Sequence, residues 1–538
     1  MIKAATAIEA IRNKVKTCES SPLLRLKPTS FTRRRKLIAA IIVTMLLRRI
    51  AQSLQLEIDA YFAIRGEEPV SKQAFSKARA NLNPMFVRSF AEDLSALHAQ
   101  DEDAQKYLGM RLIAIDGTDI ALENSAELKA YFGCSGSKKD AATALGSLAY
   151  GPLDNAIYDC QIAPYAKDER DLAKLHMARL IELKLEGSLL LFDRWYPSAE
   201  FIAYTLNAGF SFVMRVREKW NLDADAIEKD GWITLSHKGQ TMRIRVLKVK
   251  LQGGEIETLL TNLDEKQLKY KDAADLYFKR WGIETAFDLL KSKLQLENFS
   301  GKTVVSVLQD FYATVFLGDF AMICAAEANA LIEIADKDKK LKYHRKSSQN
   351  RTIAKLRNQF YSLLLEDSAE LREEMLECLF RDIAARPEPV RPDRHPPHKA
   401  PRKKRFHMSK KAVRLVQTEA LPEYQDIRDK MTLIFLPPYS PDLNPIEQVW
   451  RITRREVTHN TYFANAMVLE DTLDSYFAPL RSDPLRGRLP NCLSKPFGSG
   501  CSGIILPYPV HAKFFARGLD KGAIIIFSKY FCYSRYRY

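Results

Sequence analysis

The sequence predicts an α/β protein, and three observations support this class. The first 105 residues read as helical and basic, and from about residue 106 short apolar runs alternate with helical segments. Residues 210–262 are rich in strand patterns, with apolar side chains at alternate positions. Helical patterns follow to about residue 385. We therefore expect a mixed sheet with helices between and after its strands, preceded by a helical domain.

Length and charge limit the class of protein. A chain of 538 residues exceeds one ordinary hydrophobic core, so two to four domains are expected. The formal net charge of +16 favours a polyanionic partner, most simply nucleic acid, over the alternative of a basic enzyme that binds none.

The cysteines and the apolar runs indicate the compartment. The eight cysteines form no C-x-x-C pair, which argues against a zinc site or a disulfide framework and fits a reducing cytoplasm. The apolar run at residues 37–47 is too short to span a bilayer, and the N-terminus shows no secretory signal. We expect a cytoplasmic protein with no membrane partner.

One helix of the N-terminal segment has the composition of a DNA-recognition helix. Ser71 is a good N-cap, and the residues after it mix small apolar side chains with basic and amide ones. This pattern predicts a helix-turn-helix type of DNA-end-binding domain within residues 1–105, whose groove-facing side chains are Lys72, Gln73, Lys77 and Arg79. The alternative is an ordinary surface helix.

Two short apolar runs predict buried strands, and each is followed by an aspartate. Residues 112–115 lead into Asp116, which precedes Gly-Thr, and residues 189–192 lead into Asp193, which precedes Arg. A strand-end aspartate alone is commonplace, since either side chain could simply cap a turn.

A third carboxylate lies on a helix that has a polar stripe. Tyr277, Arg280, Glu284 and Lys291 stand at offsets 0, 3, 7 and 14, which fall within about 60° of one another on an α-helix. Apolar residues form a neighbouring stripe that can dock on a core. Gly282 in mid-helix costs about 1 kcal/mol relative to Ala, which suggests close approach of another segment. The alternative is a surface helix with an Arg–Glu pair at i,i+4.

Three carboxylates on separate elements form one candidate set: Asp116, Asp193 and Glu284. Carboxylates brought close together resist ionisation unless a cation joins them, and hard divalent ions satisfy them. Two Mg²⁺ ions can activate an attacking water or 3′-hydroxyl and stabilise the leaving oxygen, which is the chemistry of phosphodiester cleavage and strand transfer. Arg280 and Lys291 could hold phosphate oxygens beside such a site, and Tyr277 could donate a hydrogen bond.

Together these motifs resemble bacterial insertion-sequence transposases of the DDE superfamily, specifically the "IS-four" family. The motifs are the Asp-Gly-Thr, the Asp-Arg after an apolar strand, and Y-x2-R-x3-E-x6-K on the helix. Residues 70–79 and 136–144 also look like segments of that family, and the similarity covers roughly residues 25–405. The resemblance implies an RNase H-like catalytic core over residues 106–385, with a β-rich insertion at about 210–262.

The resemblance also implies roles for the site residues. The three carboxylates would be ligands of two Mg²⁺ ions, for which Mn²⁺ would substitute, and Tyr277, Arg280 and Lys291 would hold phosphates near the transposon end. Trp281 could stack on a base, although a place in the core is favoured. The implied partners are double-stranded DNA, both inverted repeats and target, and a second copy of the chain in a homodimer. The implied location is the nucleoid in a bacterial cytoplasm.

The C-terminal part resembles a different group of transposases. Residues 386–411 read as a basic, proline-rich linker. Residues 436–450 look like the end of the catalytic domain in mariner-like, "IS-six-thirty" transposases, in which Glu447 would match the third carboxylate. The two aspartates of such a domain are missing upstream. We therefore interpret residues 412–490 as a fragment joined by insertion or gene fusion, and residues 491–538 as a poorly ordered tail.

Three hypotheses of function follow from these motifs. The first is a DNA transposase that binds the terminal inverted repeats of an insertion sequence and catalyses metal-dependent strand cleavage and strand transfer. The second is a catalytically inactive fusion product that only binds DNA. The third is an RNase H-like nuclease without strand transfer.

Overall fold

The computed structural model describes most of the first 391 residues and short pieces beyond them. The described residues are 3–32, 36–49, 53–136, 141–250 and 255–391, with Thr472, Ser475 and the segments 431–433, 502–505 and 523–526. The chain forms two compact units, Met1–His407 and Met408–Tyr538. Residues 392–411 of the predicted linker, Glu447 and most of the predicted C-terminal fragment and tail lie outside the described residues.

Helices make up the N-terminal segment. They are α1 (Ala4–Lys16), η1 (Cys18–Ser20), α2 (Ala39–Leu47), α3 (Leu54–Ile64), α4 (Lys72–Arg79) and α5 (Pro84–Gln100). Helix α4 begins after Ser71, whose hydroxyl accepts a hydrogen bond from the Ala74 amide. Helix α5 begins with Pro84 after the Asn83 cap. These caps satisfy amides that have no partner within the helix.

In the described part of the chain, nine strands form one mixed sheet. They are β1 (Leu112–Ala121), β2 (Cys134–Ser135), β3 (Ala141–Gly151), β4 (Ala156–Pro164), β5 (Leu189–Phe192), β6 (Ser211–Val216), β7 (Asp230–His237), β8 (Gln240–Lys250) and β9 (Ile256–Thr261). Their order is β2-β3-β1-β5-β6-β9-β8-β7, and β4 pairs with β3. Strands β5 and β6 continue the parallel direction of β1, whereas β3 is antiparallel to both β1 and β4. Because β9 pairs with β6, the β-rich stretch at 210–262 extends the main sheet.

The two faces of the sheet pack against different helices. Ile113 and Ile115 of β1 belong to one apolar cluster with Met177 of α7 (Glu169–Glu182) and Phe201 of α8 (Ala199–Asn207). Leu112 and Ala114 belong to a larger cluster that includes the helices after the sheet. This division follows from the alternation of side chains along a strand. The short helices α6 (Ala126–Phe132) and α9 (Leu222–Ala226) connect strands.

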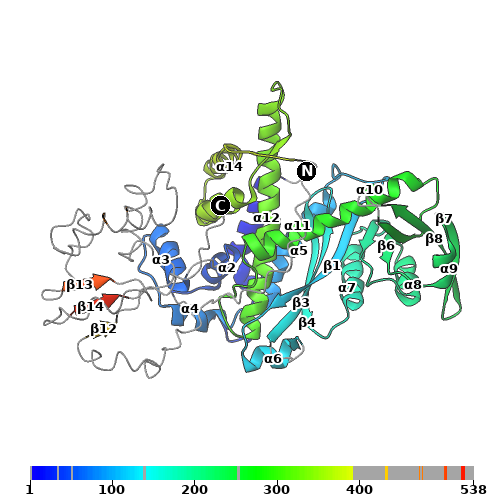
Figure 1. Cartoon of the computed structure of the whole chain (residues 1–538). Helices are drawn as coiled ribbons and strands as arrows, with labels where there is room; N and C mark the ends of the chain where they lie inside the picture. The colour runs from blue at the N-terminus through cyan, green and yellow to red at the C-terminus, as the bar shows by residue number, and fades with distance from the viewer. Residues whose placement is uncertain are drawn as a thin grey trace. The chain divides into compact units, whose positions relative to one another are not determined.

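The helices after the sheet include the longest of the described chain. They are η2 (Tyr270–Asp272), α10 (Ala273–Phe278), η3 (Lys279–Trp281), α11 (Gly282–Asp288), η4 (Leu289–Lys293), α12 (Val304–Asp336), α13 (Gln349–Leu365) and α14 (Ala369–Ala384). Figure 1 shows α12 standing upright beside the strands β1, β3 and β4. It packs on α5 and α14, and the short strands β10 (Arg345–Lys346) and β11 (Glu388–Pro389) pair near its end.

Among the described residues, α12 alone is long and apolar enough to cross a membrane by length and composition. Its most apolar window is 61% buried inside the protein. The helix also carries two buried aspartates, Asp310 and Asp319, each paired with a basic side chain from the N-terminal helices. Burial and ion pairs of this kind are those of a core helix.

The second unit is described only in short pieces. Strands β12 (Met431–Leu433), β13 (Ser502–Ile505) and β14 (Ala523–Ile526) form a parallel sheet in the order β12-β14-β13.

Candidate active site

Asp116 and Asp193 lie where the parallel pairing of β1 and β5 stops. Strand β1 pairs with β5 only from Leu112 to Ala114, and β5 ends at Phe192, directly before Asp193. The expectation that β1 itself ends before Asp116 is wrong, because β1 continues to Ala121 through its antiparallel pairing with β3. At Asp116, strand β1 is therefore paired with β3 on one side and has no pairing with β5 on the other.

Both aspartates point to the same face of the sheet. Asp116 continues the alternation of Leu112 and Ala114, and Asp193 continues that of Leu189 and Leu191. These apolar residues all belong to the larger cluster, which also contains residues of α10 and α11. The two carboxylates therefore face the helical run that carries Glu284.

Arg280 links the sheet to this helical run. Its Nη1 atom lies 3.0 Å from Oδ2 of Asp116, and its Nη2 atom lies 3.1 Å from Oε1 of Glu284. The Tyr277 hydroxyl lies 3.5 Å from Oδ1 of Asp193. Arg280 is only 4% exposed, so the pair with Asp116 is largely shielded from water. The structure thus brings Tyr277, Arg280 and Glu284 together with both aspartates.

The helical run is not one regular α-helix, which corrects the expected geometry. Between α10 and α11 the backbone tightens into the 3₁₀ turn η3, and after α11 it widens into the π turn η4. Lys291 lies in the wide turn, where its ammonium donates to Thr118 Oγ1 and to the Asp119 carbonyl, both at 2.6 Å. The polar stripe therefore lies along β1 from Asp116 to Asp119.

The close approach that Gly282 suggests is present. A Cβ atom at Gly282 would lie 2.8 Å from Cβ of Pro152, in the turn between β3 and β4, and 3.4 Å from a ring carbon of Tyr150. Trp281 beside it is 42% exposed, so the expectation of a core position is wrong; its ring lies 5.6 Å from the Arg280 guanidinium carbon. Phe278, on the same run, is also exposed.

A fourth carboxylate, Glu169, approaches this site without a signal in the sequence. Glu169 begins α7, and its carboxyl carbon occupies the space 2.8 Å from where a Cβ of Gly117 would stand. A larger residue at position 117 would require the end of the Glu169 side chain to move. Acidic residues are common in the first turn of a helix, where they interact favourably with the helix dipole. Nothing in the sequence around Glu169 distinguishes it from such a residue.

Burial and charge raise the pKa values of these carboxyl groups. Burial raises the pKa of Asp116 to about 7; Arg280 opposes this shift, and Asp193 and Glu169 add to it. Burial, followed by the charge of Asp119, raises the pKa of Glu169 as well. Burial is thus the largest influence on both carboxyl groups, and the positive charge of Arg280 offsets part of it for Asp116.

No group of three or more His, Cys, Asp or Glu residues, among those that the structure describes, is arranged to hold a metal ion. At this site the Arg280 guanidinium donates to the carboxylates of both Asp116 and Glu284.

The predicted recognition helix α4 is only partly available to a ligand. Lys72, Gln73 and Lys77 are exposed. Arg79 is not, which corrects its expected place in a DNA groove: it is 4% exposed, and its guanidinium pairs with Asp310 of α12 at 2.8 Å. Phe75 and Arg79 face the protein on the same side of α4, so the helix packs through both an apolar and a charged contact.

Comparison with known protein families gives two matches. Residues 107–317 match the family described as "Transposase DDE domain". The matched residues include Asp116, Asp193 and Glu284 and extend into α12. Residues 393–470 match a second family, "DDE superfamily endonuclease", and within them the structure describes only Met431–Leu433.

The chain is also similar to two curated bacterial proteins. The chain is 29% identical to "Putative transposase y4zB" of Sinorhizobium fredii (strain NBRC 101917 / NGR234) over 240 residues, 41% of this chain and 57% of that protein. It is 26% identical to "Putative transposase InsZ" of Escherichia coli (strain K12) over 198 residues, 34% of this chain and 62% of that protein. The chain thus spans less than two thirds of the length of either relative.

One solved structure, the piggyBac transposase synaptic complex with hairpin DNA, aligns with a TM-score of 0.36 and 11% identity. The alignment covers 71% of this chain and 86% of that one.

Proposed function

We propose that this chain is a DNA transposase of the "IS-four" type, which binds the terminal inverted repeats of an insertion sequence and catalyses metal-dependent strand cleavage and strand transfer. The observation that supports this most directly is that Arg280 links Asp116 to Glu284 while Tyr277, on the same helical run, contacts Asp193. All of these residues lie within the segment that matches the transposase DDE domain. The mixed sheet with helices on both faces is consistent with an RNase H-like core.

The donor set fits divalent cations. Asp116, Asp193 and Glu284 offer hard oxygen ligands, and Glu169 adds negative charge beside them. Burial and neighbouring carboxylates disfavour the ionised form of Asp116, and an added cation would reverse that effect. Mg²⁺ held by these carboxylates, with Mn²⁺ as a substitute, would activate an attacking oxygen and neutralise charge on the leaving one.

The cationic and phenolic side chains around the carboxylates suit a phosphodiester. In the proposed complex Arg280 and Lys291 turn toward phosphate oxygens at the transposon end, and Tyr277 donates a hydrogen bond. Arg280 and Lys291 now bind acceptors within the protein, so substrate must replace those acceptors. The exposed side chains Lys72, Gln73 and Lys77 of α4 are proposed to contact the inverted repeat.

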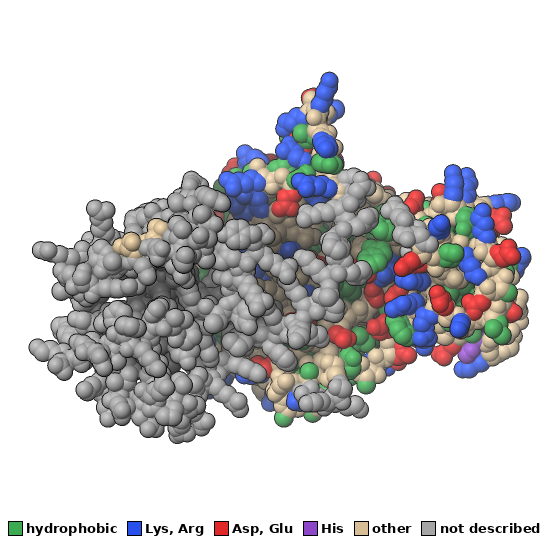
Figure 2. Space-filling model, viewed as in Figure 1, with side chains coloured by type: hydrophobic (Ala, Val, Ile, Leu, Met, Phe, Trp, Pro, Cys, Tyr) green, Lys and Arg blue, Asp and Glu red, His purple; other side chains and the backbone are tan. Residues whose placement is uncertain are grey.

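A basic surface at the end of α12 offers further phosphate contacts. Exposed lysines follow one another there: Lys337, Lys339, Lys340, Lys342 and Lys346. Figure 2 shows Lys and Arg side chains gathered at this projecting end. One of these lysines, Lys339, pairs with Asp336 at 3.3 Å. Contacts between lysine and DNA phosphates do not depend on the base sequence. The surface would therefore add affinity without adding specificity.

The C-terminal unit is proposed to be a fragment of a second DDE-type domain joined to the first. The match of residues 393–470 to the DDE superfamily endonuclease family supports this origin. The active complex is proposed to be a homodimer in the bacterial cytoplasm, bound to nucleoid DNA. Removing residues 412–538 tests whether the second unit obstructs assembly, because cleavage by the shortened chain would then rise.

The experiment that tests this function is cleavage and joining of a labelled duplex carrying the end of the flanking element. Asp116→Asn, Asp193→Asn and Glu284→Gln should each abolish Mg²⁺-dependent cleavage while DNA binding persists. Asp288→Asn, one turn after Glu284 and exposed, is the matched control and should cleave normally. Retained cleavage in any of the three variants would exclude that residue from the site. Cleavage without joined products would indicate a nuclease, and binding without cleavage a DNA-binding remnant.

A further inference from the structure

A buried chain of hydrogen bonds reaches the backbone of Asp116 from the opposite face of the sheet. The Ser147 hydroxyl of β3 donates to the Asp116 carbonyl at 3.0 Å. Nε2 of His176, on α7, lies 2.9 Å from Ser147 Oγ, and Nδ1 of the same ring lies 2.7 Å from Oδ2 of Asp159 on β4. Ser147 and His176 are fully buried, and Asp159 is 5% exposed.

The same three residue types form nucleophilic triads in hydrolases, but this arrangement has a different use. A nucleophilic serine must be reached by substrate and must give its proton to the histidine. Ser147 is 0% exposed, and its hydroxyl hydrogen is directed at the Asp116 carbonyl. Since the Ser147 hydrogen is given to the Asp116 carbonyl, Ser147 Oγ accepts from Nε2 of His176. The chain therefore holds a backbone group in place.

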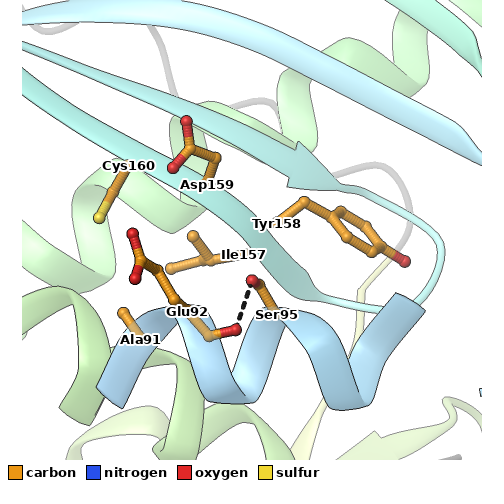
Figure 3. Close-up of a pocket in the computed structure, with 7 residues that line it drawn as sticks. All are labelled: Ala91, Glu92, Ser95, Ile157, Tyr158, Asp159 and Cys160. Carbon is orange, nitrogen blue, oxygen red and sulfur yellow. Dashed lines mark hydrogen bonds between the residues drawn. The ribbon is translucent and has the colours of Figure 1, made fainter. Parts of the chain in front are cut away.

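The far end of this chain is anchored to α5. Arg88 of α5 donates to Oδ1 of Asp159 at 3.1 Å, and its Nε atom lies 2.9 Å from Glu92 one turn later. Figure 3 shows Glu92 from α5 and Asp159 from β4 on either side of a small hollow between the two elements. Burial opposes the charge of Asp159, but His176 and Arg88 outweigh it and lower the pKa of this carboxyl. An acceptor of fixed charge thus orients the ring.

We propose that Ser147, His176 and Asp159 are positioning residues that hold the Asp116 peptide from behind the sheet while its carboxylate faces the reaction. The alternation of side chains along β1 directs the Asp116 carboxylate toward Arg280. The backbone carbonyl of Asp116 accepts from Ser147, whose side chain lies on the face of the sheet that α7 covers. At Asp116 strand β1 is paired with β3 but no longer with β5, so the Ser147 hydroxyl adds a restraint where β5 provides none. This inference rests on the proposed function, because it assigns the restraint a role in cleavage.

The test compares two buried serines in the full-length chain. Ser147→Ala removes the hydroxyl from the Asp116 carbonyl, and Ser188→Ala removes an equally buried hydroxyl that donates to the Leu185 carbonyl at 2.7 Å. Two quantities are measured: hydrogen exchange of the peptide spanning residues 112–121, and the cleavage rate at saturating DNA. We expect faster exchange and a rate about 10- to 100-fold lower in Ser147→Ala, with neither change in Ser188→Ala. Ser147→Thr keeps the hydroxyl, so its cleavage rate should be much closer to that of the natural protein than the rate of Ser147→Ala.

The two readouts separate the failure of this inference from that of the proposed function. Equal exchange in Ser147→Ala and Ser188→Ala overturns the restraint, whatever the cleavage rates are. Faster exchange in Ser147→Ala with an unchanged cleavage rate overturns the positioning role. If the natural chain does not cleave DNA at all, the proposed function fails, and exchange still decides whether Ser147 holds the Asp116 peptide.

Discussion

Arg280 donates to Asp116 and to Glu284 at once, at 3.0 and 3.1 Å, and so occupies the position between two carboxylates that a cation would share. The guanidinium therefore supplies positive charge to both carboxylates. This relationship predicts how the site responds when either charge is removed.

Arg280→Met should make the stability of the protein depend more strongly on divalent ions. Without the guanidinium, the buried Asp116 loses an ion-pair partner, and we expect a loss of about 1–3 kcal/mol in the free energy of unfolding. Mg²⁺ or Mn²⁺ should recover more of this loss than the same ions add to the natural protein. Thermal unfolding with and without each ion measures the difference.

The matched control for this prediction is Arg245→Met. Arg245 is buried and pairs with the half-buried Asp230 at 2.6 Å, on the strands β7 and β8. The Arg245→Met protein should be less stable than the natural protein, and divalent ions should not restore its stability. Equal recovery in both variants would contradict the idea that Arg280 and a metal compete for the same carboxylates.

Glu169→Gln should weaken the effect of divalent ions. The substitution keeps the shape of the side chain and removes one negative charge close to Asp116 and Asp193. We expect a higher melting temperature without divalent ions, because repulsion among the carboxylates falls, and a smaller increase on adding Mg²⁺. Glu182→Gln, at the other end of α7, is the control and should leave both values unchanged. A larger Mg²⁺ response in Glu169→Gln would refute the prediction.

The contribution of His98 to stability should fall as pH rises. Burial opposes the charge on His98, but Asp319 at 3.1 Å, with Asp154 and Asp101, outweighs it, so the pKa of His98 is raised. Arg111 lies nearby and donates to the His98 carbonyl. A raised pKa stabilises the fold below the unfolded value of about 6.5, and this stability is lost as pH rises through the folded value.

Urea unfolding of the natural protein and of His98→Gln at pH 6 and pH 9 checks the sign. The difference in unfolding free energy between them should be larger at pH 6. His237→Gln, at the end of β7, is the histidine control. A difference that grows toward pH 9 would mean that the charged form is not the one favoured by the fold.

Gly282→Ala should destabilise the protein although alanine favours helices by about 1 kcal/mol. The new Cβ would lie 2.8 Å from Cβ of Pro152, a ring atom that cannot rotate away, so α11 must shift and carry Glu284 with it. Gly318→Ala in α12 is the contrast, because its Cβ would meet the end of the flexible Leu290 side chain at 2.6 Å. Equilibrium unfolding should show the larger loss for Gly282→Ala, and a gain in stability there would contradict this account.

Alanine substitution at two basic residues of α4 should affect different properties, stability for one and DNA binding for the other. Arg79→Ala leaves the buried Asp310 with less compensation, and since Arg49 remains 3.6 Å away, we expect a loss near the lower end of about 3–5 kcal/mol. Lys77→Ala should keep stability and weaken DNA binding, with a smaller dependence of affinity on salt. Unfolding curves and binding titrations at several salt concentrations test both. If the Arg79→Ala protein stays fully stable but binds DNA more weakly, Arg79 contacts DNA as the sequence predicted.

The sequence could predict the parts of the site that depend on local pattern. Apolar runs located β5, which ends directly before Asp193, and the part of β1 that leads into Asp116. Helical spacing placed Arg280 and Glu284 on one side of their helical run. Gly282 in mid-helix correctly indicated close packing. Each of these features follows from side-chain direction along a single element.

Features that depend on distant partners could not be predicted. The composition of α4 gives no sign that Arg79 meets Asp310, because the two residues are 231 positions apart. Glu169 reaches the site only because α7 packs over Gly117. The length of β1 likewise depends on β3, which pairs with it as far as Ala121.

The helical run from α10 to η4 has a consequence for how its length can vary. The 3₁₀ turn at Lys279–Trp281 advances the chain with fewer residues per turn than an α-helix, and the π turn at Leu289–Lys293 uses more. The wide turn therefore behaves like a single inserted residue stored beside the place where Lys291 meets β1. Deleting one residue from it would therefore yield a regular helix whose later side chains, including the buried Leu294, keep roughly their present directions. A second deletion would rotate every later side chain by about 100°. The wide turn thus allows this helical run to lose one residue, but not two.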